Sequence, residues 1–345
     1  MRTNQIYKRC NMRFIQYLVI LTMVNSMLIG QDGIGPVDIV RTGQSGWQFL
    51  KIQSDPRQAA MGSVLLVNNQ ASSNATFGGP ALLTQTEGID IQFNSMTWLA
   101  DIKHTSAAIS KDFGNLGTFA LSYISLDYGQ IDETIHEEGQ GGTTTPVFTG
   151  NTFTGGDLAI GLSYARSITD RLALGGTIRY INEEIAGLGM SNWAIDFSTL
   201  YYTGLRSLRL AIVAKNFGPD THLVGYSEEL RSEPVDIRNP LEVRAGVAYD
   251  FFRKDMDQDQ DFLTLVLEGK VQSDGAEKIN LGAEYVFHGM LYLRSGYKIN
   301  YDEEGLTLGL GLDYPFGKYT MSMNYAYLDF GILTNVNMFS FGLTF

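Results

Sequence analysis

The chain has 345 residues, and its 25 lysines and arginines stand against 37 aspartates and glutamates, for a formal net charge of −12. Charged residues make up 18% of the composition and aromatic residues 12%, with 38 glycines and one cysteine. These values exclude collagen, disulfide-rich scaffolds and cysteine-ligated metal folds, and they argue against intrinsic disorder and against nucleic acid as a partner.

Residues 1–30 have the pattern of a secretory signal peptide. The first thirteen positions hold basic residues and no acidic residue, and an apolar stretch at 14–29 ends at Gly30. A basic start, a short apolar middle and a small residue before a polar segment are typical of such a signal. A membrane anchor is the alternative, but polar residues interrupt the stretch, which makes it short for a membrane span. We expect cleavage near residue 30; Met12 is a second candidate initiator.

Residues 31–88 differ from the rest of the chain. Between 43 and 83 there is no sustained alternation of apolar and polar residues. The composition is too varied for a linker, and the segment is too short for a domain with a core of its own. Its interpretation depends on the elements that follow.

From residue 89 onward, the chain alternates with a period of two, as β-strands do. The last predicted strand shows the pattern most clearly, because Phe339, Phe341, Leu343 and Phe345 alternate with Ser340, Gly342 and Thr344. In a soluble sheet the second face would usually be charged, whereas here it is small and polar. An apolar outer face and a small polar inner face are typical of transmembrane β-barrels.

Fourteen strands are predicted, an even number, as closed bacterial barrels require. Their expected ranges are 90–98, 102–111, 116–126, 157–167, 171–183, 192–203, 207–217, 241–252, 261–272, 277–287, 290–299, 304–314, 318–328 and 336–345. Connections after odd strands include the two longest, 127–156 and 218–240, whereas most turns after even strands are short. Long outer loops and short periplasmic turns are expected of such a barrel. The fold class is therefore an all-β, antiparallel transmembrane barrel spanning residues 89–345.

A barrel of this width leaves a channel unless something fills it. We therefore expect residues 31–88 to form an amino-terminal extension and a hatch inside the lumen. An arm lying across the periplasmic mouth of the barrel is the alternative.

The segments at 47–52, 57–62 and 80–83, together with 157–166 and 215–218, resemble the PorV/PorQ family over nearly the whole mature chain. The resemblance implies a FadL-like, fourteen-stranded outer-membrane barrel with an amino-terminal hatch, and a role in type IX protein secretion in Bacteroidota. The family usually has Asn-Pro-Ala before the first strand, and here Gly79 takes the place of that Asn. The hatch motif residues it implies are Phe49, Leu50, Arg57, Met61, Gly62, Pro80, Ala81 and Leu82.

Signals for enzymatic or metal chemistry are weak. The four histidines are scattered, without partners at metal-ligand spacing. The acidic turn at 255–261 begins like a calcium loop, but it has Gln260 at the sixth position and Val266 at the twelfth. The segment 161–165 resembles a nucleophile elbow but lies in mid-strand. We expect no enzymatic activity, cofactor or metal.

The long connection after the third strand carries acidic residues only, and we interpret it as an outer docking surface for a protein partner. Its candidate residues are Asp127, Asp132, Glu133, Glu137 and Glu138. A solvated loop that keeps the surface negative is the alternative. The connection at 218–240 suits a lid or a partner face equally well.

Two further predictions concern the barrel itself. Phe341, Leu343 and Phe345 at the aromatic carboxy terminus resemble the signal read by barrel-insertion machinery. Charged residues on the inner faces, among them Arg179, Glu183, Arg244, Glu268 and Lys270, are candidates for pairing across the lumen, although the sequence does not give the partners.

Three functions remain open. The first is a docking or anchoring component of type IX secretion, which binds cargo or machinery in the outer membrane. The second is a FadL-like passive carrier of hydrophobic molecules, with an apolar ligand in the lumen. The third is a structural barrel surrounded by outer-membrane lipid. The family resemblance favours the first, and no residue chemistry decides among them.

Overall fold

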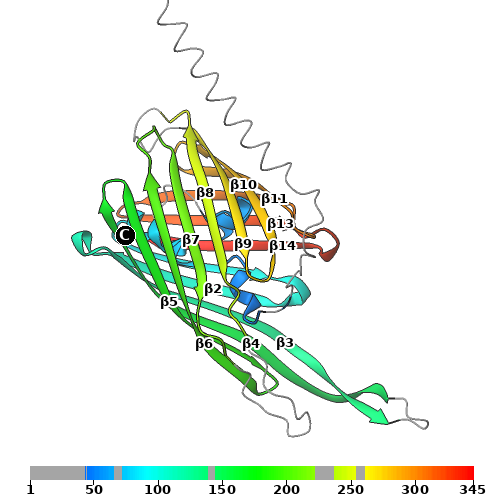
Figure 1. Ribbon diagram of the computed structural model, residues 1–345. Coiled ribbons are helices and arrows are strands. Elements are labelled where there is room, and N and C mark those ends of the chain that lie inside the picture. Colours follow the sequence, from blue (N-terminus) through cyan, green and yellow to red (C-terminus); the bar gives the residue numbers. More distant parts are fainter. Residues whose placement is uncertain (1–42, 44, 66–71, 139–143, 222–236, 254–260) are drawn as a thin grey trace, which may run out of the picture. The chain divides into compact units, whose positions relative to one another are not determined.

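The computed structural model describes residues 43, 45–65, 72–138, 144–221, 237–253 and 261–345. In these residues, fourteen antiparallel strands form a closed barrel in which each strand pairs with its neighbours in sequence and β1 pairs with β14 (Figure 1). The strands are β1 (Ile89–Thr97), β2 (Lys103–Asp112), β3 (Thr118–Glu138), β4 (Thr144–Thr169), β5 (Leu172–Ile185), β6 (Leu188–Tyr202), β7 (Arg209–Phe217), β8 (Glu242–Phe251), β9 (Phe262–Gln272), β10 (Gly275–Phe287), β11 (Leu291–Ile299), β12 (Leu306–Phe316), β13 (Tyr319–Asp329) and β14 (Asn335–Thr344).

The short helices are η1 (Gln48–Lys51), α2 (Pro56–Ala60), η2 (Ser73–Phe77), η3 (Pro80–Gln85), η4 (Leu99–Asp101), η5 (Gly114–Leu116) and η6 (Gly331–Leu333). Over the described part of the chain, none of them has the length and apolar character needed to cross a bilayer.

The alternation of apolar and small residues separates the outer face of the barrel wall from its inner face, as predicted. Phe339 and Phe341 on β14 face outward and are 58% and 45% exposed, whereas Ser340 between them is buried in the lumen. The same pattern continues around the barrel wall, where large apolar side chains are exposed on the outside. Closure follows from the register of the first and last strands, in which Phe93 lies opposite Phe341. Every strand therefore has two neighbours, as a lipid environment requires.

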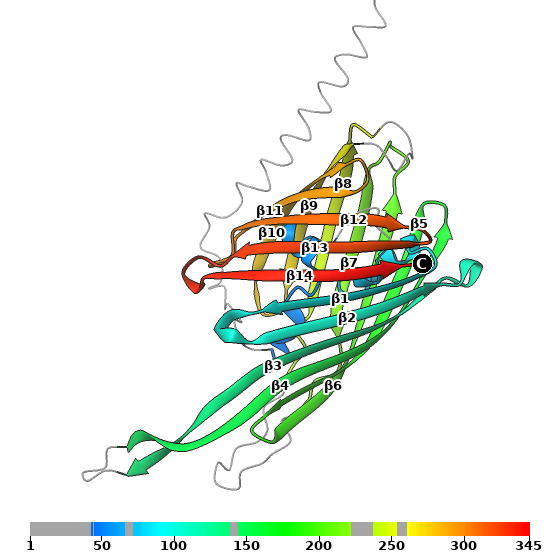
Figure 2. The same ribbon diagram turned by 180° about the vertical axis from the view of Figure 1, so that it is seen from behind.

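The predicted loop at 127–156 is wrong. The structure places most of it in strands, because β3 continues to Glu138 and β4 begins at Thr144. The two strands pair as far as Glu138 opposite Thr144, and they extend well beyond the other strands (Figures 1 and 2). The reason is local, because residues 144–154 include five threonines and two phenylalanines, which favour strands, despite the acidic residues opposite them. The other predicted strand ranges agree with the structure to within a few residues.

The two ends of the barrel differ. We call the end that holds the connections after odd strands the loop end, and the opposite end the turn end. At the turn end, β4 and β5 are joined by Asp170 and Arg171 alone. At the loop end, the long β7–β8 connection and the extended β3–β4 hairpin stand out, although the β5–β6 connection is reduced to Ala186 and Gly187.

Residues 45–65 and 72–88, which we call the hatch, lie within the barrel (Figures 1 and 2). Helix α2 packs on β12 and β13, η2 packs on β2 and β3, and η3 packs on β4, β5 and β6. Their apolar residues are buried against inward-facing residues of the wall.

Glycines on the inner wall make this close packing possible. A Cβ on Gly296 would lie 2.0 Å from the backbone nitrogen of Gly62, and one on Gly175 would lie 2.3 Å from that of Ala81. The hatch backbone therefore rests directly on the backbone of the wall at these points. Gly309 has the same role, because its Cβ would meet Ala60 at 2.4 Å.

Candidate functional site

A buried ion-pair cluster fixes the centre of the hatch to the wall. Arg57 of α2 donates to both carboxylate oxygens of Glu284 on β10, at 2.8 and 2.6 Å. Arg294 on β11 donates to the same carboxylate at 2.7 Å. All three side chains are buried, so breaking the cluster would leave a charge without full compensation. Arg57, a hatch motif residue, therefore acts as an anchor.

The flanks of the hatch are held by bonds to its backbone. The Leu65 amide donates to Glu268 at 2.8 Å, and Arg244 donates to the Ser63 carbonyl at 2.8 Å. On β7, which pairs with the strand of Arg244, Lys215 donates to the Phe77 carbonyl at 2.6 Å. The wall thus recognises the path of the hatch backbone as well as its side chains.

The first turn of the hatch is tied to the β9–β10 connection. Lys51 of η1 pairs with Asp274 at 2.6 Å, and Ser45 and Gln48 also donate to this carboxylate. Burial alone would raise the pKa of Asp274, but these hydrogen bonds, with the charge of Lys51, lower it below its usual value. The contact between η1 and the wall therefore depends on an ionised Asp274.

A cavity of about 370 Å³ lies in the lumen beside η1, toward the loop end. One side of the cavity is apolar. Its lining comes from the hatch, from β3, β13 and β14, and from the β1–β2 and β13–β14 connections. These apolar lining residues are Phe49, Leu50, Ile52, Leu65, Trp98, Ile102, Leu126, Leu328, Phe330 and Met338. Such a volume is in the range of small-molecule sites.

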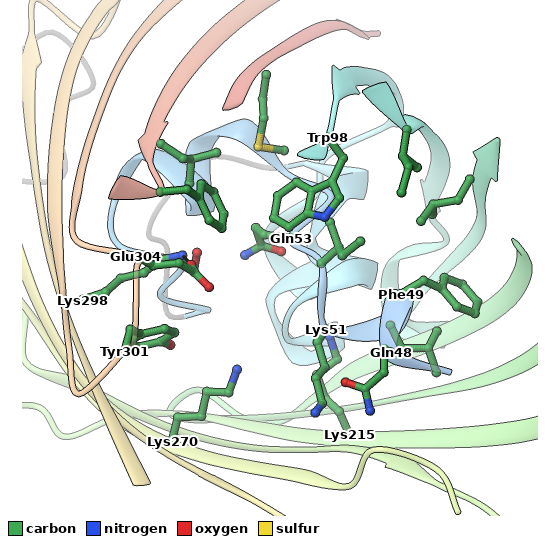
Figure 3. Close-up of a pocket in the computed structure, with 18 of the residues that line it drawn as sticks. Gln48, Phe49, Lys51, Gln53, Trp98, Lys215, Lys270, Lys298, Tyr301 and Glu304 are labelled. Atoms are coloured by element: carbon green, nitrogen blue, oxygen red, sulfur yellow. Dashed lines mark hydrogen bonds and ion pairs between the residues drawn. The ribbon is translucent and has the colours of Figure 1, made fainter. Parts of the chain in front are cut away.

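The other side of the cavity is cationic. Its charged lining residues are Lys51, Lys215, Arg244, Lys270, Lys298 and Glu304. Figure 3 shows the side chains of Lys51, Lys215 and Lys270 on one side of the cavity and Trp98 on the other. Lys270 pairs with Glu242 at 2.8 Å, and Arg244 pairs with Glu242 and Glu268, but these two glutamates are not lining residues. The lining of the cavity is therefore apolar on one side and mainly cationic on the other, where Glu304 is the acidic lining residue and pairs with Lys298.

A bulge in β7 supplies part of this cationic side. The register of β6 and β7 shifts between Ile195 and Phe197, and Asn216 has a φ of +64°. As a result, the consecutive residues Lys215 and Asn216 are both buried in the lumen, although neighbours in a regular strand face opposite sides. The backbone N–H of Asn216 stabilises the bulge by donating to the Asp196 carboxylate at 2.8 Å.

The other hatch motif residues have packing roles. Phe49 and Leu50 line the cavity, while Met61 and Gly62 contact the glycines of the wall. Gly62 has a φ of +74° and donates to Thr307 at 2.9 Å.

The third hatch segment rests on the opposite wall. Pro80 begins η3, and Ala81 donates to the Ser198 hydroxyl at 2.6 Å. Leu82 is buried. Gly79 precedes η3 as its N-cap and has no side chain with which to cap it, so the contact expected of the family's Asn is missing here.

The predicted docking residues lie on β3, and all but Asp127 are in the part of the β3–β4 hairpin that extends away from the cavity; Asp127 is next to the lining residues Leu126 and Tyr128. Asp127 accepts from the Gly129 amide at 2.9 Å, within a bulge of β3. Asp132 is exposed, and Glu133 accepts from Thr149 at 2.7 Å and Asn151 at 3.1 Å. Glu137 and Glu138 occupy strand positions opposite Thr145 and Thr144.

The inner-wall charges pair mostly with neighbouring strands. Arg179 on β5 pairs with Asp196 on β6 at 2.8 Å, a partner that the sequence did not indicate. Arg244 pairs with Glu268 on the adjacent β9 at 3.2 Å. Glu183 on β5 lies opposite Met190 on β6 and opposite Asp157 on β4. Asp157 in turn accepts a hydrogen bond from Tyr128 at 2.5 Å. Pairing is thus around the wall rather than across the lumen, except where the hatch provides the partner.

Within the described residues, no three histidine, cysteine, aspartate or glutamate side chains are grouped as a metal site. His104 is buried on β2 near the Ser54 hydroxyl at 3.3 Å, and His288 is exposed in a turn beside Asp261. The predicted signal peptide, His222 and the acidic turn at 255–260 lie outside the described residues.

Comparison with solved structures identifies the fold. The chain is similar to the toluene transporter TodX of Pseudomonas putida, with a TM-score of 0.55, 10% identity, and coverage of 85% of this chain and 97% of that one. It is equally similar to the monoaromatic hydrocarbon channel CymD, with a TM-score of 0.55, 14% identity and the same coverage. The fold is that of a FadL-like outer-membrane barrel. No protein-family model matches the chain, and no curated protein matches its sequence.

Proposed function

We propose that the protein is a passive outer-membrane channel for small amphipathic molecules that combine an apolar body with an anionic group. This proposal reverses the order of the hypotheses drawn from the sequence. The observation that carries it is the cavity beside η1, which is apolar on the side of Trp98 and cationic on the side of Lys270. TodX and CymD, which share the fold, transport or conduct hydrocarbons.

The charged side of the cavity sets this ligand class apart from plain hydrocarbons. Burying a lysine next to a hydrocarbon would leave its charge facing an apolar surface, which is unfavourable. A carboxylate or a similar anion would instead add a charge-assisted hydrogen bond to amines such as Lys270, which already pairs with Glu242, while its apolar part would contact the opposite side. Transport further requires the hatch to move, because α2 and η3 pack on opposite parts of the wall. In this proposal, residues 1–30 are the export signal, 31–88 the extension with the hatch, and 89–345 the barrel.

Ligand binding tests the proposal directly. We expect an apolar carboxylate carrying a fluorophore to bind the purified protein saturably, and an uncharged alcohol of the same chain to bind more weakly. Lys270→Met should weaken binding of the carboxylate probe by about tenfold or more, since a hydrogen bond to a charged group is lost. Lys103→Met is the matched control, because Lys103 is an exposed lysine outside the cavity. Equal, unsaturable binding of both probes would contradict the proposal.

We also propose a second candidate function, docking in type IX secretion, which rests on a different part of the molecule. The observation in its favour is the β3–β4 hairpin, which extends well beyond the other strands and carries acidic residues (Figure 2). A surface of this kind is suited to contact a protein, and the PorV/PorQ resemblance agrees with such a role. Recovery of secretion components or exported cargo with the full-length protein, and their loss when the hairpin is shortened, would support it.

A further inference from the structure

The extended part of the β3–β4 hairpin is a two-stranded ribbon, which we define as residues 130–138 and 144–154. Pairing of β2 with β3 ends at Lys103 opposite Asp127, and pairing of β5 with β4 ends at Ile185 opposite Gly155. Beyond these points, the strands of the ribbon pair with each other, and the Ala186 amide donates to the Thr154 carbonyl at the base of the ribbon. Above this base, both outer edges of the ribbon are open among the described residues (Figures 1 and 2).

An open ribbon of this kind has reason to bind another strand. Two strands alone are marginally stable in water and gain stability from a third strand or from packing on their apolar side chains. The ribbon exposes such side chains, with Ile135 49% and Phe148 72% accessible. A free strand edge also offers unpaired backbone N–H and C=O groups to an extended chain.

The two edges are not equivalent. On β4, Pro146 has no backbone N–H. The register also shifts on this strand, because residues 149–151 take the place opposite the single residue Glu133. Proline and bulges are features that protect an edge from strand addition. From Gln130 to Glu138, β3 has neither a proline nor an extra residue. The β3 edge is thus the one open to a regular strand.

Charge selects the occupant of this edge. Asp132, Glu133, Glu137 and Glu138 all lie on β3, and no lysine or arginine occurs between residues 112 and 165. A second copy of the chain would place carboxylates opposite carboxylates, which is destabilising across strands. A segment that carries lysine or arginine would instead place opposite charges next to each other.

We propose that the free edge of β3, residues 130–138, is a docking site at which an extended basic segment of a partner protein adds as a third strand. Backbone hydrogen bonds would supply the affinity and the cross-strand charge pairs the selectivity. The inference deepens the docking function and rests on it only for the existence of a protein partner. It is independent of the channel and its cavity.

Backbone methylation tests strand addition as distinct from simple charge attraction. The probe is a labelled synthetic peptide of about nine residues, with lysine alternating with valine, matched to the length of the open edge. Two further peptides carry N-methyl groups on its odd or its even residues. Only alternate N–H groups of an added strand face the ribbon, so one methylated peptide should lose binding to the full-length protein and the other should retain it. Equal binding of the two would overturn the proposal.

Charge variants provide the second arm of the test. Asp132→Asn combined with Glu137→Gln and Glu138→Gln should weaken binding of the unmodified peptide by about tenfold, because cross-strand charge pairs are lost. Glu133 is left unchanged because it holds the bulge of β4. The matched control combines Asp101→Asn and Asp302→Asn, two exposed acidic residues in loop-end connections, and should bind normally.

The two levels of failure can be told apart. If protein partners co-purify with the chain but the peptide does not bind, strand addition is wrong and docking stands. If no protein partner co-purifies and the peptide does not bind, both strand addition and the docking function are wrong.

Discussion

Single residues fix the position of the hatch on the wall, through buried ion pairs and close backbone contacts. Arg57 could be singled out from the sequence only by its motif, because its partner Glu284 lies 227 residues away in the chain. The sequence places glycines on the inner face of the wall, but it does not show that the hatch backbone rests on them. The reason is that the identity of the neighbour is a tertiary property, whereas the alternation that places glycine inward is local.

Removing the Arg57 side chain should destabilise the folded barrel. We expect Arg57→Met to reduce the free energy of unfolding by about 3 kcal/mol, because Glu284 remains buried with Arg294 as its remaining cationic partner. Denaturant unfolding in detergent, followed by tryptophan fluorescence, measures this change. Arg238→Met is the control, since Arg238 pairs with Asp220 at an exposed site. This variant should lose less than about 1 kcal/mol of its free energy of unfolding. Equal effects of the two substitutions would contradict the anchoring role.

A methyl group on the wall should loosen the hatch. Gly296→Ala places a Cβ 2.0 Å from the Gly62 nitrogen, so the hatch must shift, at a cost of about 1–3 kcal/mol. Planar bilayer recordings should then show higher ion conductance than the native protein. Gly269→Ala is the matched control, because the nearest atom to its Cβ is 4.0 Å away. Unchanged conductance in Gly296→Ala would argue against a closing role of the hatch.

Whole elements differ in how far the sequence predicts them. All of the strand ends at the turn end, and all at the loop end except those of β3 and β4, follow from short turns and a strict period of two, to within about four residues. The ends of β3 and β4 do not, because glycine and acidic residues near Asp127 and beyond suggest a loop, while pairing with the opposite strand stabilises the hairpin. The β7 bulge cannot be predicted from the sequence either, since its extra residue is seen only in the pairing of β7 with β6.

The contact of η1 with the β9–β10 connection should depend on pH. The pKa of Asp274 is lowered in the folded protein, so its stabilising effect is present at neutral pH and is lost as the pH falls through that lowered value. Trp47, which is buried beside η1, reports on this contact once Trp98 and Trp193 are replaced by phenylalanine. We expect a red shift of its emission on acidification. Asp274→Asn should show the shift already at neutral pH, and a spectrum independent of pH in both proteins would contradict the prediction.

The last strand should be essential for assembly. Phe345 exchanges backbone hydrogen bonds with Ile89, and β14 pairs with both β1 and β13. Deleting residues 339–345, which include Phe341, Leu343 and Phe345, would open the barrel and expose unpaired strand edges to lipid. We expect no heat-modifiable, folded protein in the outer membrane. Normal assembly of this deletion would show that neither closure nor the proposed assembly signal depends on these residues.

At the scale of the whole molecule, the sequence predicts the architecture better than the function. The barrel follows from its alternating pattern, and comparison with TodX and CymD places it in the FadL-like fold. The cavity could not be foreseen, because Trp98, Lys270 and Phe330 come from three parts of the chain that only closure of the barrel brings together. The sequence therefore favoured docking, whereas the arrangement of the lumen favours a ligand.

The identity of molecules that co-purify with the native protein tests this account most directly. The protein is extracted from its own outer membrane in mild detergent, and the bound small molecules and proteins are determined by mass spectrometry. We predict an apolar molecule with an anionic group, bound in a fixed ratio to the native chain and depleted in Lys270→Met. A chain free of any such molecule, with only protein partners recovered, would contradict the channel and leave docking as the function.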